Sequence, residues 1–533
     1  MREVSSIAAA RSFISATRLI ALLTLCSRVL GLLRDMTCAF FFSSNVLHYF
    51  FPAWKIPNLF RRLFGEGALS SALIPVYTEK LEDNPKSAQA LANSVFTLLV
   101  IITALIVLLG EGLIYLLLRF SSHEWKIHIL LTLAAIMLPY VLLICFAAAI
   151  GGVLQVHRRF AAPAAAPILL NVCWITAVIC FRKFFGDNEW QQIYVIAVTI
   201  LIAGCFQFLL QLPSLHRAGF RLRPRFRFKD DSIRKVALLM APMIVGLAAV
   251  QINTLIDDLI ALLLSSTLER GDAFTLLGYT ITYPVREGSA AHLYYAQRLY
   301  QFPLGVFGIA LASAAFPFLS TAAVRKDLKE FSQLLNQGIR LILFIALPVT
   351  VGLILVRTPL IELVFERGKF TPWDTQHSAW TLLFYTLGMT AYFLQQLVVR
   401  ALYSLKDPKT PVKIAVRVIG LNIVLNLILI WFLGTGGLAL STALCATVQA
   451  GILIIILVRR HHLTITGNLT SSLIKTILAT GAMTVGGFCL MHYLSQSSSW
   501  MQILIVVPAC AIIFALSSRL LKHPELHELL RRK

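Results

Sequence analysis

Five arginines interrupt long apolar stretches of the sequence, and their positions raise the first question about its chemistry. They are Arg28, Arg34, Arg61, Arg62 and Arg298. Placing one arginine at the centre of a bilayer costs about 2.5–3.5 kcal/mol. If the surrounding stretches cross a membrane, these side chains must face protein, or water held within the protein.

Two of these arginines have a carboxylate close by in the sequence. Glu66 lies one helical turn after Arg62, so the two side chains can pair on one helix face. Asp35 directly follows Arg34, and adjacent residues of a helix are not expected to face each other. A structural ion pair is therefore the favoured role of Arg62.

Arg28, Arg61 and Arg298 have no obvious acidic partner in the sequence. At 1.5 Å per residue, each reaches the middle third of a bilayer about 30 Å thick. The planar guanidinium group suits the oxygens of phosphate. These three residues are predicted to contact an anionic ligand, and internal salt bridging is the alternative.

A second polar group is predicted between apolar stretches of the second half. It consists of Asp257, Asn422, Asn426 and Thr442. A carboxylate, two amides and a hydroxyl are hard oxygen ligands that could hold a small cation such as Na⁺. An interhelical hydrogen-bond cluster is an equally good interpretation.

The composition places these residues in a membrane protein. Of 533 residues, 58% are hydrophobic and 14% are charged, and the mean hydropathy is +0.78. Soluble domains are about 25% charged. With roughly 20 residues per crossing, the sequence predicts an all-α polytopic protein of about fourteen transmembrane helices. These are expected near 14–42, 46–78, 88–119, 126–155, 161–181, 190–215, 234–264, 289–322, 335–356, 376–404, 411–433, 437–458, 471–493 and 500–520.

Lysine and arginine indicate the orientation of these helices, because cytoplasmic loops are enriched in both. The cations concentrate in every second connection and in the C-terminal tail. Arginines also interrupt the first apolar stretch, which favours an uncleaved first helix over a signal peptide. We therefore expect a multi-pass membrane protein with both termini on the cytoplasmic side.

The predicted helices form two groups of six and an additional pair. The expected divisions are an N-lobe over 1–215, a basic amphipathic cytoplasmic connector over 216–233, a C-lobe over 234–460 and a C-terminal pair with a basic tail over 461–533. Residues 48–75 and 292–317 resemble each other when one gap is allowed. Such internal repeats are common in transporters.

Other classes of function receive little support from the sequence. The net charge of +22 comes without an aromatic and basic nucleic-acid platform, so anionic membrane lipids are the expected partners and nucleic acid is not. The nine cysteines form no C-x-x-C pair, and enzyme motifs are absent. The sequence therefore favours a non-enzymatic membrane protein without a cofactor, apart from the possible Na⁺.

Several long segments resemble the MurJ (MviN) family of lipid II flippases in the MOP transporter superfamily. The most specific are SRVLGLLRD at 27–35, KIPNLFRRLFGEGALSSALIPVYTE at 55–79, YYAQRLYQFPLGVFGIAL at 294–311, GKFT at 368–371 and DPKTPVKIA at 407–415. The resemblance implies a V-shaped, two-lobed transporter that carries undecaprenyl-linked lipid II across the membrane by alternating access. Cell-wall synthesis and division proteins are possible partners.

The resemblance also implies roles for particular residues. The family's pyrophosphate-binding arginines correspond to Arg28, Arg34, Arg61 and Arg298, and the C-terminal pair resembles the helices that hold the polyprenyl tail. A sodium site of some relatives would fall on the Asp257 group. His48, Gln297 and Gln301 stand where relatives carry acids. His48, Arg62 and Glu66 are therefore secondary candidates for the substrate site.

Two other functions remain open at the level of sequence. One is the export of a drug or of another polyprenyl-linked saccharide by a transporter of the same superfamily. An arginine-lined cavity disfavours cationic drugs. The other is a non-transporting membrane scaffold that recruits cell-wall enzymes through its basic connector. The scaffold predicts sensitivity to substitution at 217–229 and tolerance of substitutions at the five arginines.

Overall fold

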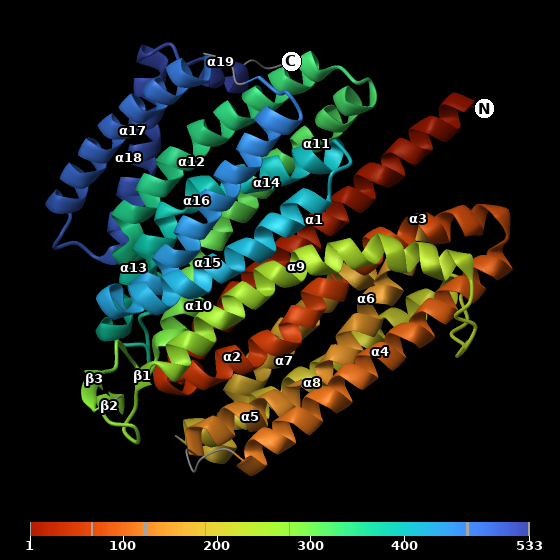
Figure 1. Ribbon diagram of the computed structural model, residues 1–533, viewed down its shortest axis with the longest axis horizontal. Helices are drawn as coiled ribbons and strands as arrows, with labels where there is room; N and C mark the ends of the chain where they lie inside the picture. The colour runs from red at the N-terminus through yellow and green to blue at the C-terminus, as the bar shows by residue number, and fades with distance from the viewer. Residues whose placement is uncertain are drawn as a thin grey trace. The chain divides into compact units, whose positions relative to one another are not determined.

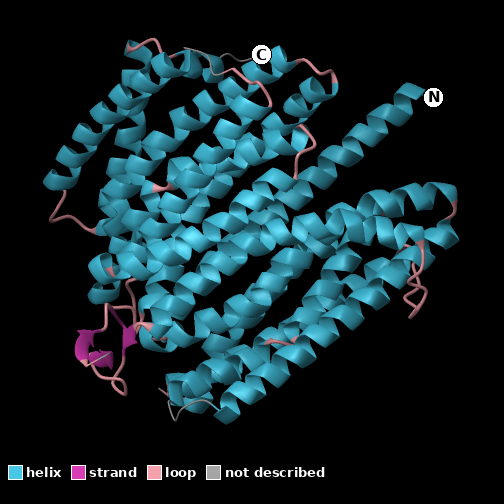
Figure 2. Cartoon of the chain, viewed as in Figure 1, coloured by secondary structure: helices cyan, strands magenta, loops and turns pink. Residues whose placement is uncertain are grey.

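The computed structural model describes residues 2–65, 68–120, 125–186, 188–276, 278–464 and 468–530. These residues are helical apart from short connections and four short strands (Figures 1 and 2). The chain divides into two compact units, Met1–Leu255 and Ile256–Lys533, which meet within one long helix. The predicted all-α membrane class is confirmed, although the strands were not predicted.

The first unit is built from long helices that follow one another in sequence. α7 contacts both α1 and α8, and α6 contacts α4 and α8. The helices are α1 (Arg2–Phe41), α2 (Ser44–Phe60), the π-helix η1 (Arg61–Gly65), α3 (Ala68–Asp83), α4 (Pro85–Phe120), α5 (Trp125–Met137), α6 (Tyr140–Val156), α7 (Ala161–Phe185), α8 (Glu189–Arg217) and α9 (Asp231–Leu263), of which α9 continues into the second unit.

The second unit begins within α9 and carries all four strands. α16 contacts α13, α14 and α15, and α12 contacts α17 and α18. Its remaining elements are β1 (Ser265–Ser266), β2 (Ala273–Leu276), β3 (Tyr279–Thr282), β4 (Val285–Arg286), α10 (Ser289–Pro303), the π-helix η2 (Leu304–Gly308), α11 (Ile309–Val324), α12 (Leu328–Phe365), α13 (Pro372–Leu387), α14 (Met389–Ser404), α15 (Lys409–Leu433), α16 (Thr435–Arg460), α17 (Asn468–Tyr493), α18 (Ser499–Leu520) and α19 (Pro524–Leu530).

The strands lie between α9 and α10, where the sequence indicated only a connection. β2 and β3 form an antiparallel hairpin, and β1 pairs in parallel with β4. Gly278 lies in the hairpin turn with a φ of 85°, a conformation that glycine adopts readily. Strands of two to four residues are too short to produce a clear alternating pattern in the sequence, so they were not predicted.

The number of membrane crossings differs from the expected fourteen. Eleven described helices are long and apolar enough to cross a membrane, and the pair α13 and α14, bent by 44°, could make a twelfth. The first two predicted stretches are helical but are not among these twelve. Both stretches contain several charged residues, including the four N-terminal arginines of interest. The count of fourteen is therefore not confirmed.

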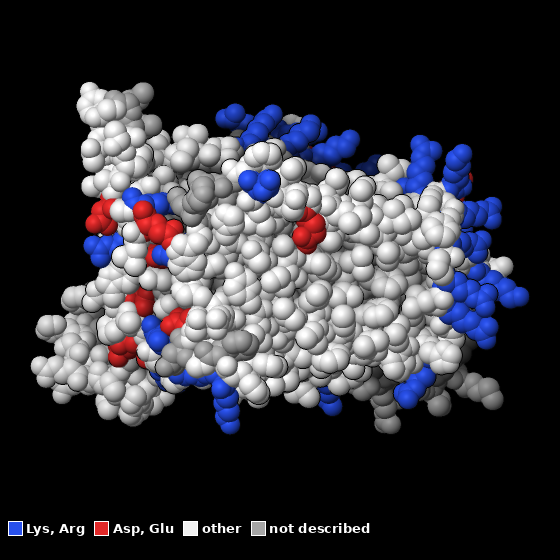
Figure 3. Space-filling model, turned by 90° about the horizontal axis from the view of Figure 1, so that it is seen from below, with Lys and Arg blue, Asp and Glu red and all other residues white. Residues whose placement is uncertain are grey.

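The surface agrees with contact to lipid. Large apolar side chains such as Leu108, Phe184 and Phe488 are about two-thirds or more exposed. Figure 3 shows a face whose middle is nearly uncharged, with the lysines, arginines and most of the acidic residues toward its margins. Water would disfavour so large an apolar area, whereas the hydrocarbon core of a bilayer would not. The exposed leucines and phenylalanines are therefore expected to contact lipid tails.

A π-helical segment occurs at matching positions of the internal sequence repeat. η1 has the sequence RRLFG, and η2 has the sequence LGVFG. Pro57 precedes η1 by four residues, and Pro303 directly precedes η2. Prolines remove a backbone donor, and π-helical turns are frequent at functional sites. The structure thus repeats an irregular helix in each unit, and the first of these contains Arg61 and Arg62.

A buried ion pair fixes α19 to the rest of the second unit. Arg340 Nε lies 2.7 Å from Glu525 Oε1, and His523 Nδ1 lies 2.8 Å from Glu525 Oε2. His523 Nε2 is 2.9 Å from Thr476 Oγ1 on α17. Burial alone would raise the pKa of Glu525, but the hydrogen bond from His523 and the nearby charges of His523 and Arg340 lower it below the ordinary value. Glu525 therefore remains ionised at neutral pH.

We predict that Glu525→Gln lowers thermal stability at pH 7, because breaking a buried pair on one side costs about 3–5 kcal/mol. A depressed carboxyl pKa contributes stability above the unfolded-state pKa and loses it as the pH falls through the folded-state pKa. The difference in melting temperature between wild type and variant should consequently shrink below about pH 4.5. The control is Glu330→Gln, which makes the same change at a half-exposed carboxylate with only a loose 4.0 Å contact to Arg325. A difference in melting temperature between wild type and Glu525→Gln that stays the same from pH 7 to pH 4 would contradict this account.

Candidate functional site

Arg34 is buried by partners within the first unit. Its Nη2 lies 2.7 Å from Asp35 Oδ1, and its Nη1 donates to Asn171 Oδ1 on α7 at 3.2 Å. The guanidinium carbon also lies 4.6 Å from the centre of the Trp174 ring. The expectation that adjacent residues would not face each other is wrong here, because the Arg34 guanidinium reaches Asp35 Oδ1 as well as Asn171 on α7. The structure therefore gives Arg34 a role in packing α1 against α7.

Arg28 lies on the same helix but is exposed. We predict that Arg34→Ala destabilises the protein by about 3–5 kcal/mol, because it removes one side of the buried ion pair between Arg34 and Asp35. Arg28→Ala is the matched control and should unfold as the wild type does. The measurement is thermal unfolding in detergent. Equal melting temperatures for the two variants would show that the pair with Asp35 contributes nothing to stability.

Arg61 and Arg62 are half-buried at the start of η1. Arg61 Nε donates to Asn58 Oδ1 at 2.8 Å, and Arg62 Nη1 donates to Gln251 Oε1 at 3.2 Å. Amide oxygens carry no net charge, so these contacts orient the guanidinium groups without neutralising them. The expected partner Glu66 lies outside the described residues, and its pairing with Arg62 stays a prediction.

Arg298 lies on α10 in the second unit and is also half-buried. Its Nη2 donates to Tyr294 Oη at 2.7 Å, and its guanidinium carbon lies 4.9 Å from the centre of the same ring. Tyr294 therefore orients Arg298 through a hydrogen bond and a cation–π contact. The neighbouring Gln297 is buried and donates to Tyr385 Oη at 2.9 Å. Gln297 thus has a structural contact within the second unit.

His48 occupies a different environment from the arginines. Its side chain is fully buried in the first unit, and its ring packs edge-on against Tyr49 with centroids 5.0 Å apart. The resemblance made His48 a secondary candidate for the substrate site. The structure places it among core side chains rather than at an accessible surface.

The four residues of the predicted cation group lie together within the second unit. Asp257 on α9 accepts a hydrogen bond from Asn426 Nδ2 at 2.6 Å and one from Thr442 Oγ1 at 3.0 Å. Asn426 Nδ2 also lies 2.9 Å from Asn422 Oδ1 on the same helix, α15. The side chains of Asp257, Asn422 and Asn426 are fully buried. The structure therefore joins α9, α15 and α16 through one polar cluster.

Ser441 also belongs to this cluster, although it was not among the predicted residues. Its hydroxyl donates to Asn426 Oδ1 at 2.6 Å and is fully buried. Adjacency to Thr442 was the available signal, and small residues around it permit close helix packing. The donor set fits a small hard cation, because the five side chains Asp257, Asn422, Asn426, Ser441 and Thr442 supply a carboxylate, two amide oxygens and two hydroxyls. The described residues contain no cluster of three or more histidine, cysteine or acidic side chains suited to a metal.

Comparison with known proteins places these features in a family. A family model described as "Lipid II flippase MurJ" matches residues 37–521. A "Probable lipid II flippase MurJ" from Vibrio cholerae serotype O1 is 34% identical, and the match covers 82% of this chain and 81% of the relative. A "Lipid II flippase MurJ" from Burkholderia cenocepacia is 29% identical over 92% of this chain and 93% of its own length.

The fold is also similar to solved structures. A structure described as "Lipid II flippase MurJ, inward closed conformation" is 26% identical, with a TM-score of 0.73, and the match covers 95% of this chain and 99% of that chain. An inward-facing multidrug resistance transporter of the MATE family and the MOP superfamily has a TM-score of 0.64 at 12% identity, covering 84% of this chain and 99% of that chain. The second likeness shows the shared fold only.

Proposed function

The chain belongs to the MurJ family of lipid II flippases, and we propose that its arginines hold the pyrophosphate of lipid II while it crosses the membrane. It is a multi-pass protein of the inner membrane. In the proposed direction, the headgroup enters from the cytoplasmic leaflet and leaves in the periplasmic leaflet. The proposed orientation has both termini in the cytoplasm.

The contacts of Arg61 and Arg298 carry this proposal. Each guanidinium is oriented by a neutral oxygen, from Asn58 and Tyr294 respectively. A guanidinium presents its five N–H donors as a planar fork, and this geometry matches the oxygens of a phosphate group. A side chain held in this way loses less conformational freedom when the ligand binds. Arg28 is exposed in the first unit and supplies a third candidate cation.

The membrane potential can drive such a transfer. Each elementary charge that crosses the membrane is worth about 2.3 kcal/mol per 100 mV. The bacterial interior is electrically negative, so outward movement of an anionic pyrophosphate is favourable. Arginines then lower the cost of bringing that anion into the bilayer without changing the overall driving force. We propose this potential, together with an ion gradient, as the energy source.

The Asp257 cluster is the proposed site of a coupling ion. Asp257, Asn422, Asn426, Ser441 and Thr442 would hold Na⁺ through oxygen atoms, and the bound ion would cancel the charge of the buried carboxylate. In its absence, the hydrogen bonds from Asn426 and Thr442 satisfy Asp257. The cluster connects α9 with α15 and α16, so ion binding would change how these three helices are held together.

The helices α17 and α18 are the proposed groove for the polyprenyl tail. Both pack against α12 around a small core that includes Val356, Met483 and Val506. Their opposite faces expose large apolar side chains, among them Phe488 and Leu504. A polyprenyl chain is itself apolar, so it could lie on this face without a large desolvation cost.

The connector between α8 and α9 bears on the scaffold alternative. Residues 220–230 form neither helix nor strand, and backbone atoms of Arg221, Arg223 and Arg225 bond to polar side chains of α4. Four exposed arginines alternate with Leu222 and exposed aromatic or proline residues in the sequence RLRPRFRF. This alternation suits a segment lying on an anionic membrane surface, which favours a connector held against α4 over a recruitment arm.

The test is reconstitution of the purified full-length chain in vesicles that contain fluorescent lipid II. An external reagent reaches only the labelled lipid II in the outer leaflet, so the label that it cannot reach measures the lipid II in the inner leaflet. We expect the protein to accelerate the exchange of lipid II between the two leaflets. The scaffold alternative predicts no acceleration by the protein alone. A variant with Arg223 and Arg225 replaced by alanine separates the two functions, because transport should persist in the variant if the connector only contacts lipid.

A further inference from the structure

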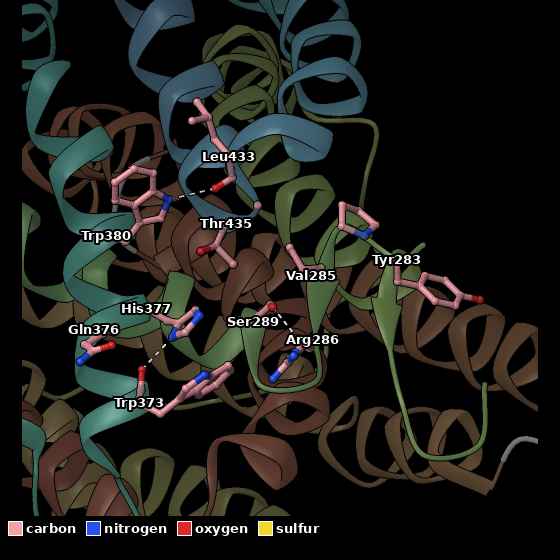
Figure 4. Close-up of a pocket in the computed structure, with 12 residues that line it drawn as sticks. Tyr283, Val285, Arg286, Ser289, Trp373, Gln376, His377, Trp380, Leu433 and Thr435 are labelled. Atoms are coloured by element: carbon pink, nitrogen blue, oxygen red, sulfur yellow. Dashed lines mark hydrogen bonds between the residues drawn. The ribbon is translucent and has the colours of Figure 1, made fainter. Parts of the chain in front are cut away.

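A pocket of about 480 Å³ lies at the end of the second unit that carries the strands (Figure 4). The segment leading into α10, the first turns of α13 and the turn between α15 and α16 line it. None of the arginines or cation-cluster residues described above is among its lining residues. Its volume lies within the roughly 300–1,000 Å³ of pockets that enclose small ligands.

Aromatic rings form much of the wall of this pocket, and two of them are held in place. Trp380 Nε1 donates to the backbone oxygen of Leu433 at 3.0 Å. The rings of Trp373 and His377 overlap with centroids 3.8 Å apart and an angle of 31° between their planes. In Figure 4 the side chains of Trp373, His377 and Arg286 lie on one side and that of Trp380 lies on another. The pocket therefore has oriented aromatic surfaces on more than one side.

Polar groups stand between these rings. His377 Nδ1 lies 2.8 Å from the backbone oxygen of Trp373. A carbonyl oxygen only accepts hydrogen bonds, so Nδ1 carries the proton and Nε2 of the neutral ring remains an acceptor. Gln376 adds an exposed amide and Arg286 an exposed guanidinium. Hydrogen-bond donors and acceptors are thus both available.

The lining contains no carboxylate. The nearby Asp374 is buried, accepts a bond from His292 Nε2 at 2.8 Å and caps the start of α13. A cationic ligand would therefore find no opposing charge in this pocket. A free phosphate would find one guanidinium among mostly uncharged walls, which is a weak set of donors compared with a cluster of arginines.

We infer that this pocket binds a saccharide, and specifically the N-acetylated amino sugars of the lipid II headgroup on the periplasmic side. Sugar rings present hydroxyl and amide groups at their edges and polarised C–H groups on their faces. The electron-rich faces of indole rings suit those C–H groups, and Gln376, His377 and Arg286 suit the edges. In the proposed orientation α9 runs outward, so the strands lie in the periplasm. This inference rests on the proposed function, because the headgroup reaches this side only after transfer.

The probe for the test is N,N′-diacetylchitobiose, a soluble disaccharide of N-acetylglucosamine. Saturation-transfer NMR on the full-length protein in lipid nanodiscs should detect its binding. Gln376→Ala should weaken binding by about 2- to 12-fold, as expected for the loss of one neutral hydrogen bond. Trp380→Phe should weaken it as well, whereas Trp500→Ala on α18 is the matched control and should leave it unchanged.

The outcomes separate this inference from the proposed function. Absence of chitobiose binding to the wild type, or equal binding by all three variants, would overturn the saccharide site. Inorganic pyrophosphate is the alternative probe. If pyrophosphate binds to the wild type but not to Arg286→Ala, and chitobiose gives no signal, the pocket is an anion site instead of a saccharide site. Chitobiose binding that persists in Arg61→Ala, while translocation is lost, supports a saccharide site separate from the arginines. Failure of translocation by the wild type would overturn the proposed function and the assignment of the sugar to the lipid II headgroup, whereas chitobiose binding would still show a saccharide site.

Discussion

Arg61→Ala and Arg298→Ala are each expected to slow lipid II translocation by about 10- to 150-fold, because losing one charge-assisted contact costs about 1.5–3 kcal/mol. The two residues lie in different units, and each is oriented by a neutral neighbour rather than buried in the core. The measurement is exchange of fluorescent lipid II in vesicles reconstituted with equal amounts of each protein. Arg28→Ala should reduce exchange as well, without a change in melting temperature.

Lysine provides a sharper form of the same test. Arg61→Lys and Arg298→Lys keep the charge but lose the planar fork, so they should recover only part of the activity. Arg119→Ala, at an exposed position near the end of α4, is the control for loss of a surface cation. Translocation at the wild-type rate by both the Arg61 and Arg298 alanine variants would rule out pyrophosphate binding by these arginines. If translocation is lost only in variants whose melting temperature is also lower, Arg61 and Arg298 contribute to stability instead of to substrate binding.

Asp257→Asn is expected to abolish any response of the protein to Na⁺. A ligand present at ten times its Kd stabilises the folded state by about 1.4 kcal/mol. The wild type should therefore melt at a higher temperature in Na⁺ than in K⁺ at the same ionic strength. The variant keeps a group that can bond to Asn426 and Thr442 but lacks the negative charge that attracts the cation. It should melt at the same temperature in both salts.

Asp258→Asn is the matched control, because it makes the same chemical change at the next residue of α9. Asp258 is as deeply buried as Asp257, yet it contributes to none of the hydrogen bonds given above for the cluster. The Asp258→Asn variant should still melt at a higher temperature in Na⁺ than in K⁺. A wild-type protein that melts identically in both salts would return the Asp257 cluster to the role of an interhelical hydrogen-bond network. A Na⁺ response that survives in Asp257→Asn would place the ion elsewhere.

The class of fold could be predicted from the sequence because membrane burial acts on each segment almost independently. An apolar stretch of about 20 residues must form a helix in lipid, where every backbone group needs an internal partner. For the same reason the positions of the helices agree closely with the predicted stretches. The predicted count of fourteen crossings is not confirmed for the first two stretches, which arginines and prolines interrupt. The short strands before α10 have no alternating pattern in the sequence.

The candidate site could be predicted only in part. Residue type identified Arg61 and Arg298 as costly in lipid, and amides spaced one turn apart identified Asn422 and Asn426 as one helix face. The side chains that contact these residues could not be predicted from the sequence, since they come from other turns or other helices. Packing of α1 on α7 turned Arg34 into a buried ion pair with Asp35, and packing of α15 on α16 added Ser441 to the polar cluster.

The sequence by itself therefore determined the membrane class, the helical stretches and the residues whose burial demands a partner. These properties depend on the free energy of moving each side chain from water to lipid, which is local. Only the tertiary structure decided which partners those residues have, where the chain forms π-helical turns and how Trp373, His377 and Trp380 come to line one pocket. Such contacts join residues far apart in the chain, and their geometry depends on how whole helices pack.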